Sequence, residues 1–221
     1  MSFRIFRPSR RAFLSTLALG GAAFTTRGAF ADVLSQTPRI QEGPFYPTKL
    51  PLDTDNDLLI INDAITPAIG EVTHLSGRIL DTKGDPIRGA IVEIWQSDRD
   101  GTYWKPHLDN GDKYDTNFQG FGRFLTGSKG EYYFRTLKPV PYTGRPAAHI
   151  HFKIHRNNKA VLTTECFVKG YANNEKDDIY RKATATEAGK KLAVDFVPVK
   201  DSRIGELAAT FDVVLGVLRE S

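Results

Sequence analysis

A pair of histidines separated by one residue is the feature of this sequence best suited to chemistry. It occurs as His149-Ile150-His151, in an apolar segment that continues through Phe152 and Ile154. Because side chains alternate between faces along a strand, both imidazoles would project from one face, with Cα atoms about 7 Å apart. Two imidazoles on a rigid strand can bind one metal ion. Taken alone, the motif is more typical of two histidines on the surface of a sheet than of a metal site.

Two tyrosines precede this strand in segments rich in turn-forming residues. Tyr103 follows the turn Asp98-Arg99-Asp100-Gly101, and Tyr142 lies in the proline-rich segment 138–145, which ends at Arg145. Most tyrosines in β proteins are half-buried packing residues whose hydroxyl is hydrogen-bonded. That interpretation applies to the six remaining tyrosines: Tyr46, Tyr114, Tyr132, Tyr133, Tyr171 and Tyr180.

The elements that must position these residues are mostly strands. Short runs of β-branched and aromatic residues alternate with turn signals, which predicts an all-β fold, an antiparallel β-sandwich with long loops and little helix. The expected strands span residues 72–80, 90–96, 131–136, 149–155, 162–169, 192–197 and 210–215. Residues 174–191 are the best candidate for a helix, and the Gly- and Phe-rich segment 115–123 is expected to be a loop.

The excess positive charge lies at the N-terminus. Residues 1–31 contain five arginines and no acid, and they combine Arg10-Arg11 with a short apolar stretch and Ala29-Phe30-Ala31, as in a twin-arginine export signal. Without those arginines, residues 32–221 carry 25 basic against 26 acidic residues, a net charge of −1. We therefore expect a signal peptide over 1–31, export to the periplasm, and one domain over 32–221. We expect no nucleic-acid partner and no membrane span.

Residues 32–221 contain a single cysteine and a proline-rich start. Cys166 has no partner, which excludes an intramolecular disulfide and a Cys-rich zinc or iron–sulfur site. The segment 41–52, which contains Gly43 and Pro44, is expected to run extended over the domain surface.

Taken together, these segments resemble a known family. In order they read V-E-I-W-Q at 92–96, G-T-Y at 101–103, N-F-Q-G-F-G-R at 117–123, K-P-V-P-Y at 138–142 and H-I-H at 149–151. This series resembles the intradiol ring-cleavage dioxygenases, and within them the subunits of protocatechuate 3,4-dioxygenase. The resemblance covers roughly residues 41–216 and implies a β-sandwich.

The resemblance also implies a site and a reaction. A mononuclear ferric ion, Fe(3+), would be held by Tyr103, Tyr142, His149 and His151, and phenolates favour ferric iron because they are hard anionic oxygens. The substrates would be a catechol, of the catechol or protocatechuate type, and O₂, giving a cis,cis-muconate-type product. In the family the second tyrosine, here Tyr142, is displaced by substrate and helps to take up its protons. A homo-oligomer is compatible with these expectations.

Three departures from the family pattern concern the substrate pocket. Arg145 lies four residues before His149 instead of three, and it is expected to stabilise an anionic intermediate. Thr164-Glu165 stands where the family has Thr-Gln, and an acid there would disfavour a substrate carboxylate. The loop between Tyr142 and His149 is short. Gly43, Pro44, Arg145 and Glu165 are the candidate substrate-binding residues, and Tyr142 and Arg145 are the candidate catalytic residues.

Two other interpretations remain open. Residues 77–94 also resemble transthyretin-like and carboxypeptidase-regulatory sandwiches, which would make the chain a binding module without redox catalysis. The same four ligands could instead hold copper or zinc. The two tyrosines and H-I-H in the right order favour the enzyme over the binding module, and two tyrosinates argue against zinc.

Overall fold

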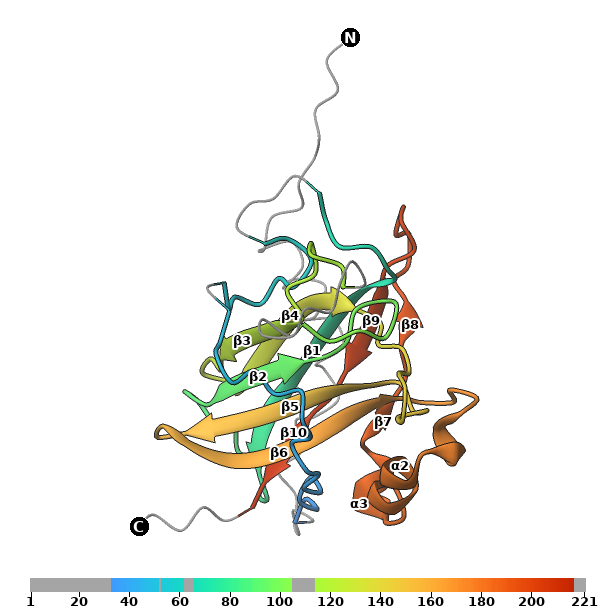
Figure 1. Cartoon of the computed structure of the whole chain (residues 1–221). Coiled ribbons are helices and arrows are strands. Elements are labelled where there is room, and N and C mark those ends of the chain that lie inside the picture. The colour runs from blue at the N-terminus through green and yellow to red at the C-terminus, as the bar shows by residue number, and fades with distance from the viewer. Residues whose placement is uncertain (1–32, 52, 62–65, 105–113, 217–221) are drawn as a thin grey trace. The chain divides into compact units, whose positions relative to one another are not determined.

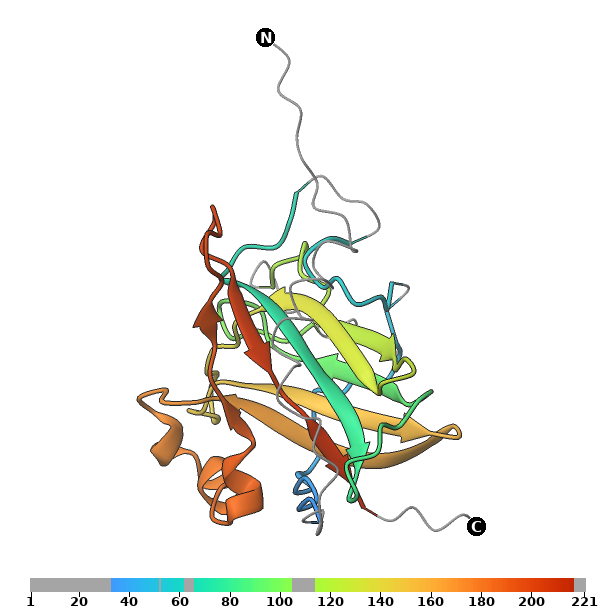
Figure 2. The same ribbon diagram turned by 180° about the vertical axis from the view of Figure 1, so that it is seen from behind.

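The computed structural model describes residues 33–51, 53–61, 66–104 and 114–216. The segment expected to be a signal peptide, 1–31, lies outside these residues. The described residues form two five-stranded sheets, which lie one behind the other (Figure 1, Figure 2).

The first sheet is built around the longest strands of the N-terminal half. Strand β1 (Val72–Asp81) pairs antiparallel with β4 (Glu131–Leu137) on one side. On the other side it pairs in parallel with β9 (Leu207–Thr210) and β10 (Val213–Leu215), and β8 (Val197–Pro198) pairs with β9. The C-terminal strands thus complete a sheet that begins near the N-terminus.

The second sheet carries the histidine pair at its centre. Its order is β3 (Phe121–Leu125), β2 (Ile91–Trp95), β5 (His149–Arg156), β6 (Lys159–Val168) and β7 (Ala193–Val194). All of its pairs are antiparallel except β6 with β7. Strand β5 therefore has a hydrogen-bonded neighbour on both sides, which fixes the positions of its side chains.

The hydrophobic core lies between the two sheets. Phe152 from β5 packs against Tyr132 from β4, with ring centroids 5.9 Å apart, and against Phe211, at 5.0 Å. Ile150, Phe152 and Ile154 are completely buried. The alternation expected for β5 therefore turns these residues into the core and leaves the histidines on the outer face of the second sheet.

The expected fold class is confirmed, with differences in detail. Both sheets are mixed instead of purely antiparallel, because β9 and β10 run parallel to β1 in the first sheet and β7 runs parallel to β6 in the second. Residues 121–125, expected within a loop and its flank, form β3, and the expected strand 192–197 is divided between β7 in one sheet and β8 in the other.

The expected helical segment contains three short pieces instead of one helix. They are η3 (Asn174–Lys176), α2 (Asp178–Ala183) and α3 (Glu187–Lys190). Asp177 caps α2 by accepting from the backbone N–H groups of Ile179 and Tyr180, and Thr186 caps α3. Among the described residues no helix has the length and apolarity needed to cross a bilayer.

Candidate active site

The two histidines of β5 lie side by side and are almost completely buried. His149 is 2% exposed and His151 is 1% exposed, and their ring centroids are 4.8 Å apart. The Nδ1 of His149 lies 2.7 Å from the carbonyl oxygen of Ala147, which indicates that it carries the proton. Its Nε2 is buried without a hydrogen-bond partner. A lone pair is thereby presented to the space between the histidines and tyrosines, as metal ligation requires.

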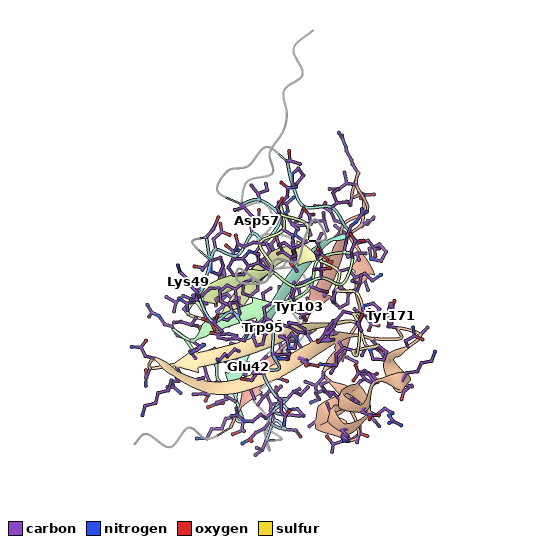
Figure 3. The ribbon with its side chains drawn as sticks, in the orientation of Figure 1. Glu42, Lys49, Asp57, Trp95, Tyr103 and Tyr171 are labelled. Carbon is purple, nitrogen blue, oxygen red and sulfur yellow. The ribbon has the colours of Figure 1, made fainter. Side chains whose placement is uncertain are left out.

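His151 is oriented from three directions. Its Nε2 lies 3.1 Å from the hydroxyl of Tyr103, and its Nδ1 lies 3.4 Å from Oε1 of Glu165 on β6. The indole of Trp95 stacks on the ring, with centroids 4.7 Å apart and planes inclined by 3°. Figure 3 shows Trp95 and Tyr103 near one another over the second sheet. Neighbours on all these sides leave His151 little rotational freedom.

Tyr103 follows a turn that is stabilised by one buried aspartate, Asp98. The carboxylate of Asp98 accepts from the backbone N–H groups of Asp100 (3.0 Å), Thr102 (2.9 Å) and Asp115 (2.9 Å). Gly101 in this turn has φ +79°, and a Cβ there would lie 2.9 Å from the carbonyl oxygen of Pro141. Only glycine at position 101 therefore allows the turn before Tyr103 to pack this closely against the segment that contains Tyr142.

Tyr142 is held by a tight turn with Arg145. The backbone N–H of each residue donates to the carbonyl of the other, at 3.1 and 2.9 Å, and Gly144 between them has φ +87°. The rings of Tyr142 and Tyr103 lie 5.1 Å apart, edge to face. Tyr142 is half-buried, whereas Tyr103 is only 5% exposed. Of the two phenols, Tyr142 is thus the more accessible.

Burial shifts the pKa values of the four residues. It raises the pKa of Tyr103 well above the ordinary phenol value, and the neighbouring Tyr142 and Glu165 add to this increase. Burial also raises the pKa of Tyr142, against the opposing effect of Arg145. The pKa of both histidines is lowered, mainly by burial. Two neutral imidazoles and two protonated phenols therefore face one another, and only a nearby cation would make ionised phenols favourable.

Arg145 is bound on two sides by buried carboxylates. Its Nη1 and Nη2 donate to Glu165 at 3.0 and 2.6 Å, and its Nε donates to Asp177 at 2.9 Å. Asp177 also accepts from the backbone N–H of Ala147, at 3.2 Å, and so joins the start of α2 to the residues before β5. Arg145 thus joins Glu165 and Asp177 in one ionic network.

The N-terminal segment 41–50, here called the strap, covers the site. Phe45 stacks on Tyr103, with centroids 4.3 Å apart and planes inclined by 6°, and meets Tyr142 edge to face at 5.5 Å. A Cβ on Gly43 would lie 3.9 Å from Cε1 of His151. In Figure 1 this blue segment runs across the strands of the second sheet. The strap therefore forms a wall of the site.

A buried carboxylate anchors the strap. Glu93 on β2 is completely buried and accepts hydrogen bonds from Tyr46 of the strap (2.9 Å), and from Arg123 on β3 (2.6 and 3.1 Å). Nε2 of His155 on β5 lies 2.7 Å away. Lys153 lies over the ring of Tyr46, 3.7 Å from its centroid, and pairs with Glu42, which Figure 3 labels below Trp95. The network fixes the strap relative to β5.

The predicted site residues come together in space. Tyr103, Tyr142, His149 and His151 form one cluster, with Arg145 and Glu165 beside it and Gly43 against His151. Pro44 lies in the strap between Gly43 and Phe45. Within the described parts of the chain, His149, His151 and Glu165 also form a group whose ligand atoms lie within 4.8 Å of one another.

Three residues at the site were not identified from the sequence. Trp95 and Phe45 stack on the ligand candidates, and Asp177 binds Arg145. The position of Trp95 on the same strand face as Glu93 could have suggested its proximity to His151, because β2 and β5 are neighbours. Nothing in the sequence pairs Asp177 with Arg145.

Comparisons with known proteins show the family of the chain. Residues 41–217 match the family model described as Dioxygenase. The protocatechuate 3,4-dioxygenase beta chain of Burkholderia cepacia is 30% identical over 189 residues, which cover 82% of this chain and 80% of that protein. A hydroxyquinol 1,2-dioxygenase of a Rhizobium species is 32% identical over 153 residues, covering 61% of this chain and 48% of the relative. This chain thus spans about half of the second relative.

A solved structure shares the fold. The dioxygenase domain of a dioxygenase–carbohydrate-binding fusion protein from Streptomyces sp. SirexAA-E superposes with a TM-score of 0.63 and 26% identity, covering 83% of this chain and all of that domain. The chain therefore belongs to the Dioxygenase family, a family of oxidoreductase enzymes. The relatives it matches are intradiol ring-cleavage dioxygenases that act on protocatechuate, catechol and hydroxyquinol.

The Glu93 network predicts a pH-dependent stability. Burial alone would raise the pKa of Glu93, but the hydrogen bonds from Arg123, His155 and Tyr46 outweigh it and lower the pKa below 4.5. A carboxyl with a lowered folded pKa stabilises the protein above its unfolded pKa, and this contribution is lost as pH falls through the folded value. Glu93→Gln should therefore reduce the free energy of unfolding by about 2 kcal/mol at pH 7. The difference from wild type should shrink as the pH falls below 4.5.

Urea unfolding at several pH values measures this difference. Glu71→Gln is the matched control, because Glu71 forms an exposed ion pair with Lys138 and its side chain is 61% exposed. The control should follow wild type at each pH. A Glu93→Gln difference that stays constant from neutral to acid pH would contradict the assignment.

Proposed function

We propose that this protein is a non-haem Fe(III)-dependent intradiol dioxygenase, which inserts both atoms of O₂ into a catechol to give a cis,cis-muconate-type product. The observation that carries the proposal is the convergence of two buried imidazoles and two phenols on one space, with Nε2 of His149 unpartnered. A binding module of the transthyretin-like type would need no such group. Burying two imidazoles together costs free energy that a bound cation would offset.

The donor set suits ferric iron better than zinc. Two phenolate oxygens are hard anionic ligands, and two neutral imidazoles complete a mixed oxygen and nitrogen set. Zinc sites in proteins are built mainly from Cys, His and carboxylates. Tyr103, Tyr142, His149 and His151 would hold the ion. Four protein ligands leave room for solvent or substrate.

The residues around this group would bind and orient the catechol. The chemistry that ferric iron supplies when bound is activation of a chelated catecholate toward O₂, with cleavage between the two hydroxyl-bearing carbons. Tyr142 is the more exposed phenol and is the group best placed to accept a substrate hydroxyl proton on its Oη. Phe45 and Trp95 pack around Tyr103 and His151 and keep water from that side of the site.

A visible spectrum with metal analysis tests the proposal. Tyrosinate-to-iron charge transfer should make the purified protein reddish, with about one iron per chain. Adding catechol under air should change the spectrum and consume O₂. A colourless protein that remains iron-free after expression with iron would overturn the ferric assignment.

Replacement of Tyr142 by Phe tests the role of the second phenol. The variant loses one oxygen ligand and one proton acceptor but keeps its ring contacts, so the fold should survive. We expect a shifted visible band and turnover slower by a factor of about 100, the range of a lost acid–base group. Tyr171→Phe is the control, since Tyr171 is labelled well away from Tyr103 in Figure 3. Unchanged colour and rate in Tyr142→Phe would make Tyr142 a packing residue.

We also propose that residues 1–31 are a twin-arginine signal and that the enzyme works in the periplasm. Support comes from Arg10-Arg11 before an apolar stretch and from Ala29-Phe30-Ala31. In a bacterial host, the double variant Arg10→Lys and Arg11→Lys should leave the protein in the cytoplasmic fraction, whereas Arg4→Lys should not. Equal periplasmic recovery of the double variant and wild type would refute the twin-arginine route.

A further inference from the structure

Two carboxylates and one arginine form a buried ionic cluster beside the candidate metal ligands. The side chains of Glu165 and Asp177 are 1% and 2% exposed, and that of Arg145 is 13% exposed. The three donors that reach these carboxylates occupy both edges of the guanidinium, so Arg145 is bonded to acids of the chain itself. The cluster has a formal charge of −1.

The negative charge of Glu165 lies next to the candidate metal ligands. Its Oε1 lies 3.4 Å from Nδ1 of His151, and Glu165 raises the pKa of Tyr103 through its charge. A cavity of about 400 Å³ borders Tyr142 and Arg145, and the other charged residues that line it are Lys176, Asp177 and Asp178. Two cations and two anions thus line this space, and Arg145, one of the cations, is already bound to Glu165. No surplus positive charge among these groups is available to a substrate anion.

A catechol that carries a ring carboxylate would bring one more negative charge into this site. The carboxylate would remain unpaired in a partly buried space, pair only with the solvent-exposed Lys176, or displace Glu165 or Asp177 from Arg145. The first and last are unfavourable because a buried charge without its partner is costly, and an exposed ion pair stabilises little. A catechol with uncharged substituents meets neither cost.

We propose that Glu165, through its bridge with Arg145, is a specificity-determining residue that closes the site to carboxylate-bearing catechols and favours uncharged ones. The inference rests on the proposed function and adds the substrate class. The inference concerns the ratio of kcat/KM, and the ratio of Kd, between an uncharged catechol and one that carries a carboxylate. An effect of Glu165 on the donor strength of His151 acts on both substrates alike and cancels in that ratio.

The test compares catechol with protocatechuate, which differs from it by a ring carboxylate. For the iron-loaded enzyme, kcat/KM is measured for both substrates from O₂ uptake, and Kd is measured for both by calorimetry without O₂. Wild type should prefer catechol by at least tenfold. Glu165→Gln keeps the shape of the side chain and removes its charge, so it should shift both ratios at least tenfold toward protocatechuate.

Three further variants separate charge from packing. Glu165→Asp keeps the charge and should retain the wild-type preference. Asp177→Asn removes the other charge of the cluster and should shift the ratios in the same direction as Glu165→Gln, which keeps the proposal testable if Glu165→Gln does not fold. Asp57→Asn removes an arginine-paired carboxylate, bound to Arg135 on β4 in the other sheet, and should leave the ratios unchanged.

The outcomes distinguish this inference from the proposed function. Wild-type binding and turnover of protocatechuate equal to those of catechol would overturn the inference alone. Unchanged ratios in both Glu165→Gln and Asp177→Asn would do the same. Failure of wild type to bind or turn over either catechol would overturn the proposed function, and the inference with it.

Discussion

The two faces of strand β5 lie in different environments, and the rest of the structure depends on which side chains each face carries. One face of the strand carries completely buried apolar residues between the sheets, and the other carries two almost completely buried imidazoles. The period of two along a strand makes the assignment strict, because a shift of one residue would put Phe152 in the site and His151 in the core. Antiparallel neighbours on both sides hold that register. The hydrophobic core thereby determines the position of the site.

The two candidate tyrosine ligands come from loops, since β5 contributes only the two histidines. Tyr103 and Tyr142 come from irregular segments, and each is fixed by local hydrogen bonds: the carboxylate of Asp98 in one and the paired backbone of Tyr142 and Arg145 in the other. The strap then closes over both tyrosines through Phe45. The site is consequently assembled from a rigid strand and three segments that are ordered by polar contacts.

Much of this arrangement could be predicted from the sequence, and the remainder could not for physical reasons. The histidine pair, β1, β2, β4 and β5 follow from alternation and from turn residues, which are local signals. Strand β3 was missed because Phe121-Gly122-Arg123 has the glycine content of a loop, yet it pairs with β2 along its whole length. The bond between Arg145 and Asp177 depends on where α2 begins in space. Contacts of this kind arise from tertiary structure and produce no periodic pattern in the sequence.

The parallel pairing of β1 with β9 and β10 has a consequence for the order of folding. Arg78 on β1 and Asp212, just before β10, are joined by hydrogen bonds although 134 residues separate them in the chain. Thr37, ahead of the strap, exchanges hydrogen bonds with Val214 across 177 residues. Such pairs close only late, since loop closure costs entropy before distant strands can bind. On the ribosome, the first sheet therefore remains incomplete until β9 and β10 have emerged, long after the synthesis of β1.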